Sequence, residues 1–182
     1  GTLYISGKGA MYNYDTIDYP PWYGCRGQIT AVVIEEGVTT IGDLAFYYCK
    51  QLRSVTIPDS LTMIGFASFM ECDNLSYIEI GANVVYIGEH VFCGCELLQT
   101  FTVAKENPAY ANDSYGVLFD KNMETLIAAP GAITGHYDIP YGVIKIGDDA
   151  FYGCNGLTGI TIPNTVTTIG NGAFSCCFGL TS

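Results

Sequence analysis

The chain has 182 residues, 49% of them hydrophobic, which suffices for one folded unit with a continuous core and argues against disorder. Eighteen acidic and seven basic residues give a formal net charge of −11, and no run of Lys or Arg occurs, so we expect neither nucleic acid nor an anionic membrane as a partner. No apolar stretch approaches the roughly 18 residues of a membrane span, and the first residues lack the pattern of a signal peptide. We therefore expect no membrane insertion and interpret the chain as a mature or trimmed segment.

Residues 1–28 are interpreted as an N-terminal cap with a degenerate repeat. The stretch TLYISG, residues 2–7, predicts one strand, and a long connection rich in aromatic residues and Pro follows it. Counting back 23 residues from Phe46 leads to Tyr23, so the stretch WYGCRGQITAVVI is interpreted as a degenerate repeat. Terminal repeats of a solenoid are commonly atypical because they shield the first core layer from water.

Residues 29–103 repeat with a period of 23 residues. The dodecapeptide IGDLAFYYCKQL at Ile41 returns as IGFASFMECDNL at Ile64 and as IGEHVFCGCELL at Ile87. Each repeat also has an alternating stretch such as LRSVTIP, which predicts a strand with Val55 and Ile57 pointing inward. Such a period predicts a solenoid in which one strand per repeat pairs in parallel with its equivalents and each crossover is right-handed.

The repeated side chains are expected to stack along the solenoid as ladders. The Gly after each repeated Ile is interpreted as the residue that supplies a tight or left-handed turn. The Phe are expected to form one buried column with rings about 5 Å apart wherever strands pair directly. The Cys are expected to be buried free thiols that bond to backbone groups, with neither a metal nor disulfides. These positions are Gly42, Gly65, Gly88, Gly147 and Gly170; Phe46, Phe69, Phe92, Phe151 and Phe174; and Cys49, Cys72, Cys95, Cys154 and Cys177.

Residues 104–135 interrupt the period. Val103 and Ile139 are 36 residues apart, which is one period plus an insertion of 13. Two apolar runs, Val117 to Phe119 and Thr125 to Ala128, flank the turn-prone DKNM and predict a β-hairpin, whose second arm could also join the main sheet. The repeats resume in residues 136–182, and the array is expected to be truncated at its C-terminal end and to continue in the natural protein.

The unit ITIPNTVTTIGNGAFSCCFGL, residues 160–180, resembles the BspA-like leucine-rich repeat, whose pattern is Ile-Pro, Val, Ile-Gly, Ala-Phe, Cys, Leu. Five units match this pattern. Period and resemblance together predict an α/β fold: a right-handed leucine-rich-repeat solenoid with a parallel sheet on one face and short helical turns and loops on the other. The departures from the pattern are Ser68 in place of Ala, His90 and Val91 in place of a small pair, and the extra Cys93 and Cys176.

No catalytic residue, cofactor or metal ligand is predicted. His90 is expected to be a surface or loop residue, and only Cys25, Cys93 and Cys176 are candidates for reactive thiols. Two acidic pairs, 35–36 and 148–149, resemble calcium ligands, but Phe66 breaks the column to which the second pair belongs. A solvated acidic edge is the preferred interpretation.

The predicted ligand-binding face is the outward side of the strands, where most positions hold small or β-branched residues. The predicted site consists of Tyr77, Glu79, Thr100, Thr102, His136 and Asp138. The resemblance implies a bacterial extracellular or cell-surface module for adhesion or for protein or glycan recognition, without catalysis, and we expect a monomer. The alternative is a passive spacer that presents another domain of a longer protein.

Overall fold

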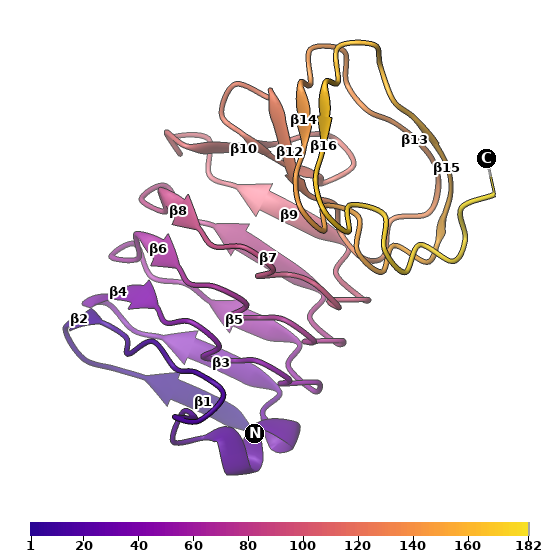
Figure 1. Ribbon diagram of the computed structural model, residues 1–182. Coiled ribbons are helices and arrows are strands. Elements are labelled where there is room, and N and C mark those ends of the chain that lie inside the picture. Colours follow the sequence, from indigo (N-terminus) through magenta and orange to yellow (C-terminus); the bar gives the residue numbers. More distant parts are fainter. Residues whose placement is uncertain (182) are drawn as a thin grey trace.

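The computed structural model describes residues 1–181 and shows a stack of coils with two rows of parallel strands on different sides (Figure 1). The first row contains β1 (Thr2–Ile5), β3 (Ala31–Ile34), β5 (Ser54–Thr56), β7 (Tyr77–Ile80), β9 (Thr100–Val103), β13 (Gly135–Asp138) and β15 (Leu157–Thr161). The second row contains β2 (Gly9–Ala10), β4 (Val38–Ile41), β6 (Met63–Ile64), β8 (Tyr86–Ile87), β12 (Thr125–Ala128), β14 (Lys145–Ile146) and β16 (Thr168–Ile169).

The strand register confirms the period read from the sequence. Val32 pairs with Val55, and Ile78 pairs with Phe101, so the steps between these neighbouring strands are one repeat of 23 residues, whereas the cap strand β1 pairs with β3 at a separation of 29 residues. The first row is not one sheet, however, but three separate ones: β1-β3-β5, β7-β9 and β13-β15. The widest interruption lies between β9 and β13, where the insertion leaves the stack.

The expectation of helical turns is not borne out. A single 3-10 helix, η1 (Tyr23–Gln28), is the only helix in residues 1–181, and the return segments between the two rows are turns. Their backbone explains why: in the first full return segment Leu44 and Tyr48 are left-handed, with φ of 54° and 62°. Two left-handed residues so close together prevent a right-handed helix from continuing. The fold is therefore a β-solenoid with very little helix.

The repeated Gly has a different role from the predicted one. Gly42 and Gly65 are not among the residues with positive φ. A Cβ added to Gly42 would lie 1.8 Å from the carbonyl oxygen of Tyr12, and one added to Gly65 would lie 2.7 Å from the backbone nitrogen of Asp43. The Gly therefore permits close approach of consecutive turns, and the left-handed positions lie elsewhere in the repeat.

The predicted Phe column is present, but it is broken. Phe46 stacks on Phe69 at 5.3 Å between ring centroids, and Phe69 stacks on Phe92 at 6.2 Å. Phe151 stacks on Phe174 at 5.2 Å, but no ring contact joins Phe92 to Phe151 within residues 1–181. Phe92 and Phe174 are accordingly half-buried, because neither is covered by a following Phe.

The cap begins this column with Trp22, one residue before the position that lies 23 residues ahead of Phe46. The ring that stacks on Phe46 is that of Trp22, at 5.7 Å, and the Trp22 Nε1–H donates to the carbonyl of Ala45 at 2.7 Å. Tyr23 instead stacks on Tyr19 at 3.9 Å. The indole therefore closes the core and satisfies a backbone carbonyl with the same side chain.

The insertion forms the predicted hairpin and answers which sheet it joins. β11 (Leu118–Asp120) pairs antiparallel with β10 (Tyr110–Asn112) and with β12. β12 then pairs in parallel with β14, Leu126 beside Ile146, so the second arm becomes a rung of the second row and not of the first. The buried Asn107 anchors this segment, because its amide donates to the carbonyls of Gly81 and Val84.

The buried apolar residues form two clusters, and the insertion contributes residues to both. One contains buried residues between Ile29 and Leu118, and the other contains buried residues between Val117 and Ala173. The two clusters share no residue among the described ones. Each therefore serves as the core of one half of the solenoid, and the insertion is the junction between the halves.

Candidate functional site

The first predicted group of site residues lies on β7 and β9. Tyr77 is beside Thr100 and Glu79 is beside Thr102, so the four side chains form a compact block on the outward face. Tyr77 is 51% exposed, and Glu79 and Thr102 are exposed as well. Thr100 is partly covered because Gly116 of the insertion lies against it. Three of the four are thus accessible to a ligand.

His136 and Asp138 form a second, separate group on β13. The His136 Nε2 atom lies 2.8 Å from the Thr161 hydroxyl and 3.3 Å from a carboxylate oxygen of Asp138. The Thr161 hydroxyl and the His136 imidazole lower the pKa of Asp138. β13 pairs with β15 and not with β9, so the six predicted residues come together as two groups rather than one.

A segment of the insertion lies between the two groups. The Phe101 N–H on β9 donates to the carbonyl of Gly116, and the ring of Tyr115 packs edge-to-face on Tyr137 of β13 at 5.3 Å. Tyr115 is itself 57% exposed. Sequence reasoning missed this residue, because it predicted the hairpin arms but not the course of the chain that leads into them.

A cleft lies at the junction of the return segments. In regular turns, three backbone N–H groups donate to three carbonyls of the next turn. These pairs are Leu44 to Phe66, Phe46 to Ser68 and Tyr48 to Met70, followed by Ala67 to Glu89, Phe69 to Val91 and Glu71 to Cys93. The equivalent N–H groups of the following turn belong to His90, Phe92 and Gly94, and they have no hydrogen-bond partner in the described chain. The ladder of the return segments therefore stops there.

The ladder of backbone hydrogen bonds stops because the return segment that follows β12 is flat, that is, without an outward bulge. This segment, residues 129–134, contains none of the left-handed residues that make the other return segments bulge outward. Ala129 of this segment and Ala128 at the end of β12 line a cavity of about 270 Å³ between the turns at residues 87–93 and 147–152. The insertion thus supplies a rung to the second row but no bulge to cover Phe92.

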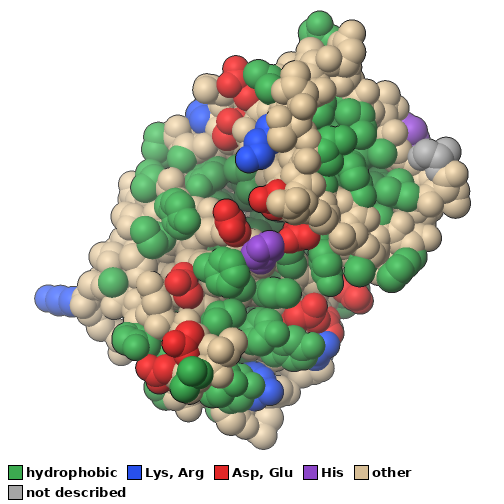
Figure 2. Space-filling view, viewed as in Figure 1, with side chains coloured by type: hydrophobic (Ala, Val, Ile, Leu, Met, Phe, Trp, Pro, Cys, Tyr) green, Lys and Arg blue, Asp and Glu red, His purple; other side chains and the backbone are tan. Residues whose placement is uncertain are grey.

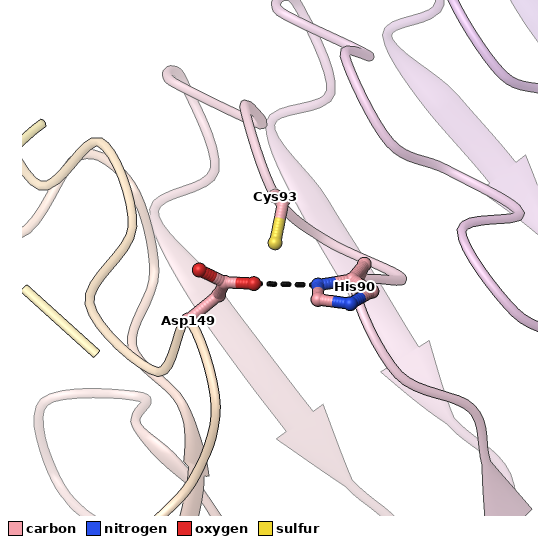
Figure 3. Close-up of side chains that lie close together, drawn as sticks. All are labelled: His90, Cys93 and Asp149. Carbon is pink, nitrogen blue, oxygen red and sulfur yellow. Dashed lines mark ion pairs between the residues drawn. The ribbon is translucent and has the colours of Figure 1, made fainter. Parts of the chain in front are cut away.

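Three side chains with metal-binding atoms meet in this cleft. The His90 Nδ1 atom lies 2.5 Å from a carboxylate oxygen of Asp149, and the donor atoms of His90, Cys93 and Asp149 all lie within 4.8 Å of one another. Figure 3 shows the three side chains pointing into one space, and Figure 2 shows acidic side chains around a histidine in the middle of this face. Burial, together with the Asp149 and Glu71 carboxylates, raises the pKa of the Cys93 thiol to about 12.

The cleft corrects two expectations and extends a third. His90 lies in a return segment as expected, but its side chain, 34% exposed, also pairs with Asp149. Asp149 is not part of a solvated edge, since its side chain is 18% exposed. Cys93 is 7% exposed and is therefore not a reactive thiol. One signal in the sequence could have revealed the cluster. His90 and Asp149 each lie three residues after the repeated Ile, and their turns become neighbours if the insertion adds no outward bulge.

Two other acidic residues, Asp43 and Asp148, cap backbone N–H groups of the next turn. A carboxylate oxygen of Asp43 accepts from the N–H of Phe66 at 2.7 Å, and Asp148 accepts from the N–H of Asn171 at 2.6 Å. Since these carboxylates already have N–H partners in the next turn, their repetition has a structural cause.

The repeated Cys behave largely as predicted. The thiol of Cys72 donates to the carbonyl of Phe46, and that of Cys95 donates to the carbonyl of Phe69, both at 3.3 Å. Cys177 makes the same bond to Phe151, but it is half-buried rather than buried because no described turn follows it. Cys25 and Cys176 are the exposed thiols, and all eight cysteines are free.

Comparisons with known proteins agree with this architecture. The family model for the BspA type leucine rich repeat region matches six copies over residues 15–116 and 134–182. This match does not indicate an enzyme family. Among curated proteins the chain has no match. No helix in residues 1–181 is long and apolar enough to cross a membrane.

Solved structures of bacterial leucine-rich repeat proteins are similar to the chain. A leucine-rich cell surface protein from Faecalibacterium prausnitzii A2-165 has 35% identity and a TM-score of 0.79, over 87% of this chain and 42% of that one. A leucine-rich repeat protein from Eubacterium ventriosum has 29% identity and a TM-score of 0.61, over 96% of this chain and 59% of that one. The pneumococcal vaccine antigen PcpA, at 22% identity and a TM-score of 0.79, shares the fold. This chain thus spans about two fifths to three fifths of these proteins, and it belongs to the BspA type leucine-rich repeat family.

Proposed function

We propose that this chain is a recognition module on the outside of a bacterial cell and that it binds a protein or a glycan through the outward face of its first strand row. Its family consists of repeat proteins found on bacterial surfaces, whose members generally bind proteins. The net charge of −11 is consistent with a protein or glycan ligand and disfavours polyanions. Catalysis is no part of the proposal.

The block on β7 and β9 is the observation that carries this proposal. Tyr77 is 51% exposed on a face where most positions, such as Ala31 and Ser54, hold small or β-branched side chains, although Tyr4 of β1 is also exposed there. A Tyr ring offers a large contact area at low conformational entropy, which makes it a common anchor of recognition surfaces. Neither Tyr77 nor Glu79 has a side-chain hydrogen bond to another described residue, so both polar ends are available to a ligand.

The group on β13 supplies a second contact point. The His136 imidazole and the Asp138 carboxylate are exposed and hold each other in a fixed orientation with Thr161. Fixed polar side chains lose little entropy when they bind. A ligand that spans both groups would pass over the exposed Tyr115.

An array of host-surface glycans and a panel of extracellular host proteins would test the proposal with the full chain. We expect a ligand whose binding is weakened about tenfold or more by Tyr77→Ala or Glu79→Gln, because interface anchors cost more than 1 kcal/mol when truncated. Tyr141→Ala is the matched control, since Tyr141 is 82% exposed but follows the end of β13. A ligand that Tyr141→Ala affects as strongly as Tyr77→Ala would place the binding face elsewhere. No binding to either panel would favour the passive spacer.

A further inference from the structure

We propose that the junction cleft is a site for a divalent transition metal ion of the zinc type, bound by His90 Nδ1, the Cys93 thiolate and the Asp149 carboxylate. The three donor atoms already lie within 4.8 Å of one another. They come from two different return segments, residues 87–93 and 147–152, which line one cavity of about 270 Å³. This proposal is independent of the recognition face on the other row of strands.

The donor set selects the class of metal. Imidazole nitrogen, thiolate sulfur and carboxylate oxygen are the three ligand types that zinc accepts, whereas calcium and magnesium require oxygen alone. In tetrahedral zinc, bond lengths of about 2.0–2.3 Å place neighbouring donors roughly 3.4–3.6 Å apart. The His90–Asp149 contact of 2.5 Å must therefore open by about 1 Å while the Cys93 sulfur approaches. Small side-chain rotations achieve both, and the fourth position is left to water.

The orientation of the side chains favours a metal over a catalytic relay. In a relay, the nucleophile and the carboxylate occupy opposite nitrogens of the imidazole ring. Here Asp149 contacts Nδ1, the Cys93 sulfur points toward the same side, and the other ring nitrogen points away from both (Figure 3). All three donors thus converge on one point.

The fold also fixes the backbone positions from which the ligands project. His90 and Asp149 hold the same left-handed position in the two return segments that line the cleft, with φ of 57° and 51°. The His90 ring is further held edge-to-face on Phe66 at 5.4 Å. Ala128 and Ala129, which replace a full bulge, leave the space between the two segments open. The donors are therefore preorganised on the backbone, and binding would join the two halves of the solenoid.

The test uses the full chain, freed of metal with a chelator and titrated with Co²⁺, whose thiolate complexes absorb light by charge transfer. We expect one equivalent of Co²⁺ to bind with a thiolate band, Zn²⁺ to displace it, and the melting temperature to rise with the metal concentration. Cys93→Ser should remove the band, and Asp149→Asn should weaken binding roughly 100-fold or more, since even outer-shell changes cost 10- to 100-fold. Cys176→Ser and His136→Ala are controls that should leave binding unchanged.

X-ray absorption at the zinc edge of the unaltered chain provides a readout that does not depend on any variant. We expect a single sulfur neighbour at about 2.3 Å with nitrogen and oxygen neighbours at about 2.0–2.2 Å. Lack of a thiolate band, an unchanged affinity in Cys93→Ser, or a zinc spectrum without sulfur would each overturn the proposal. If Cys93→Ser fails to fold, the zinc spectrum alone decides.

Discussion

The regular stack of residues 29–103 and the junction that follows it are built from the same repeat, yet they differ in what they leave unpaired. In the stack, each return segment is covered by the next through a stacked Phe and three backbone hydrogen bonds. At the junction the hairpin replaces one bulge, so Phe92 is half-buried and the N–H of His90 lacks a partner in the described chain. In the regular repeats, backbone N–H groups are thus paired with the next turn, whereas the interruption leaves such groups available for other interactions.

The largest expected difference between these regions is in the free energy of unfolding. Phe69→Ala should lower it by about 3–5 kcal/mol, because the ring is fully buried between two others. Phe92→Ala should cost about half as much, ~2 kcal/mol, because one side of its ring borders the cleft. Urea denaturation of both variants measures this difference, and equal losses would mean that the cleft closes in solution.

A second pair of variants tests the spacing of the turns. Gly65→Ala should cost about 1–3 kcal/mol, because its Cβ would meet backbone atoms of Asp43 and Gly42 at 2.7 and 2.8 Å. Gly147→Ala, directly after β14, should cost less than about 1 kcal/mol, because the nearest neighbour of the added Cβ is the carbonyl oxygen of Leu126 at 3.0 Å. Thermal melts of the two proteins would contradict this account if Gly147→Ala were the less stable.

Thiol labelling compares the accessibility of cysteines in the two regions without any substitution in the chain. In the native protein, a chromogenic disulfide reagent should label Cys25 and Cys176 rapidly, and all eight thiols only after denaturation. Cys93 should resist labelling although it borders the cleft, because its pKa is raised to about 12 and little thiolate exists at neutral pH. Mass spectrometry of labelled peptides identifies the sites, and rapid labelling of Cys93 would show that the cleft is open to reagents.

The smallest expected effect concerns the outward face of the second half. The carboxyl of Asp138 should titrate below the value of 3.8 for a free Asp, and Thr161→Val should raise its pKa, because the hydroxyl contributes most to lowering it. A lowered pKa means that the interaction stabilises the fold above the unfolded pKa and is lost as pH falls through the folded one. An NMR titration of the Asp138 side chain checks this, and an unchanged pKa in Thr161→Val would exclude the hydroxyl as the cause.

The sequence predicted the solenoid well because each repeat adds independent evidence for the same architecture. Five copies of Ile, Gly, Phe, Cys and Leu at one spacing predict a stack whatever each unit does alone, and the thiols of Cys72 and Cys95 bond to the backbone as expected. The hairpin arms also followed from local pattern. The left-handed conformations of Leu44 and Tyr48 did not, because the energy of stacked turns and not side-chain preference imposes them.

The candidate sites were harder to predict because they depend on which turns become neighbours. The outward positions of Tyr77 and Glu79 follow from alternation within one strand, and the structure places both there. The meeting of His90 with Asp149 required knowing that the 13 inserted residues would add a rung without a bulge. That outcome depends on small residues such as Ala129 and on the pairing of β12 with β14, which no periodicity encodes.

The division of the apolar core into two clusters has a mechanical consequence. Bending inside the regular stack would separate stacked rings and break three backbone hydrogen bonds between neighbouring return segments, whereas the return segments on the two sides of the cleft share no such hydrogen bonds within residues 1–181. We therefore expect the solenoid to bend more readily at this junction than within either half. Because Tyr77 lies on one half of the solenoid and His136 on the other, the angle at the junction sets the distance between them. A ligand that contacts both residues would therefore favour one angle at the junction, and a metal ion bound in the cleft would restrict the same angle.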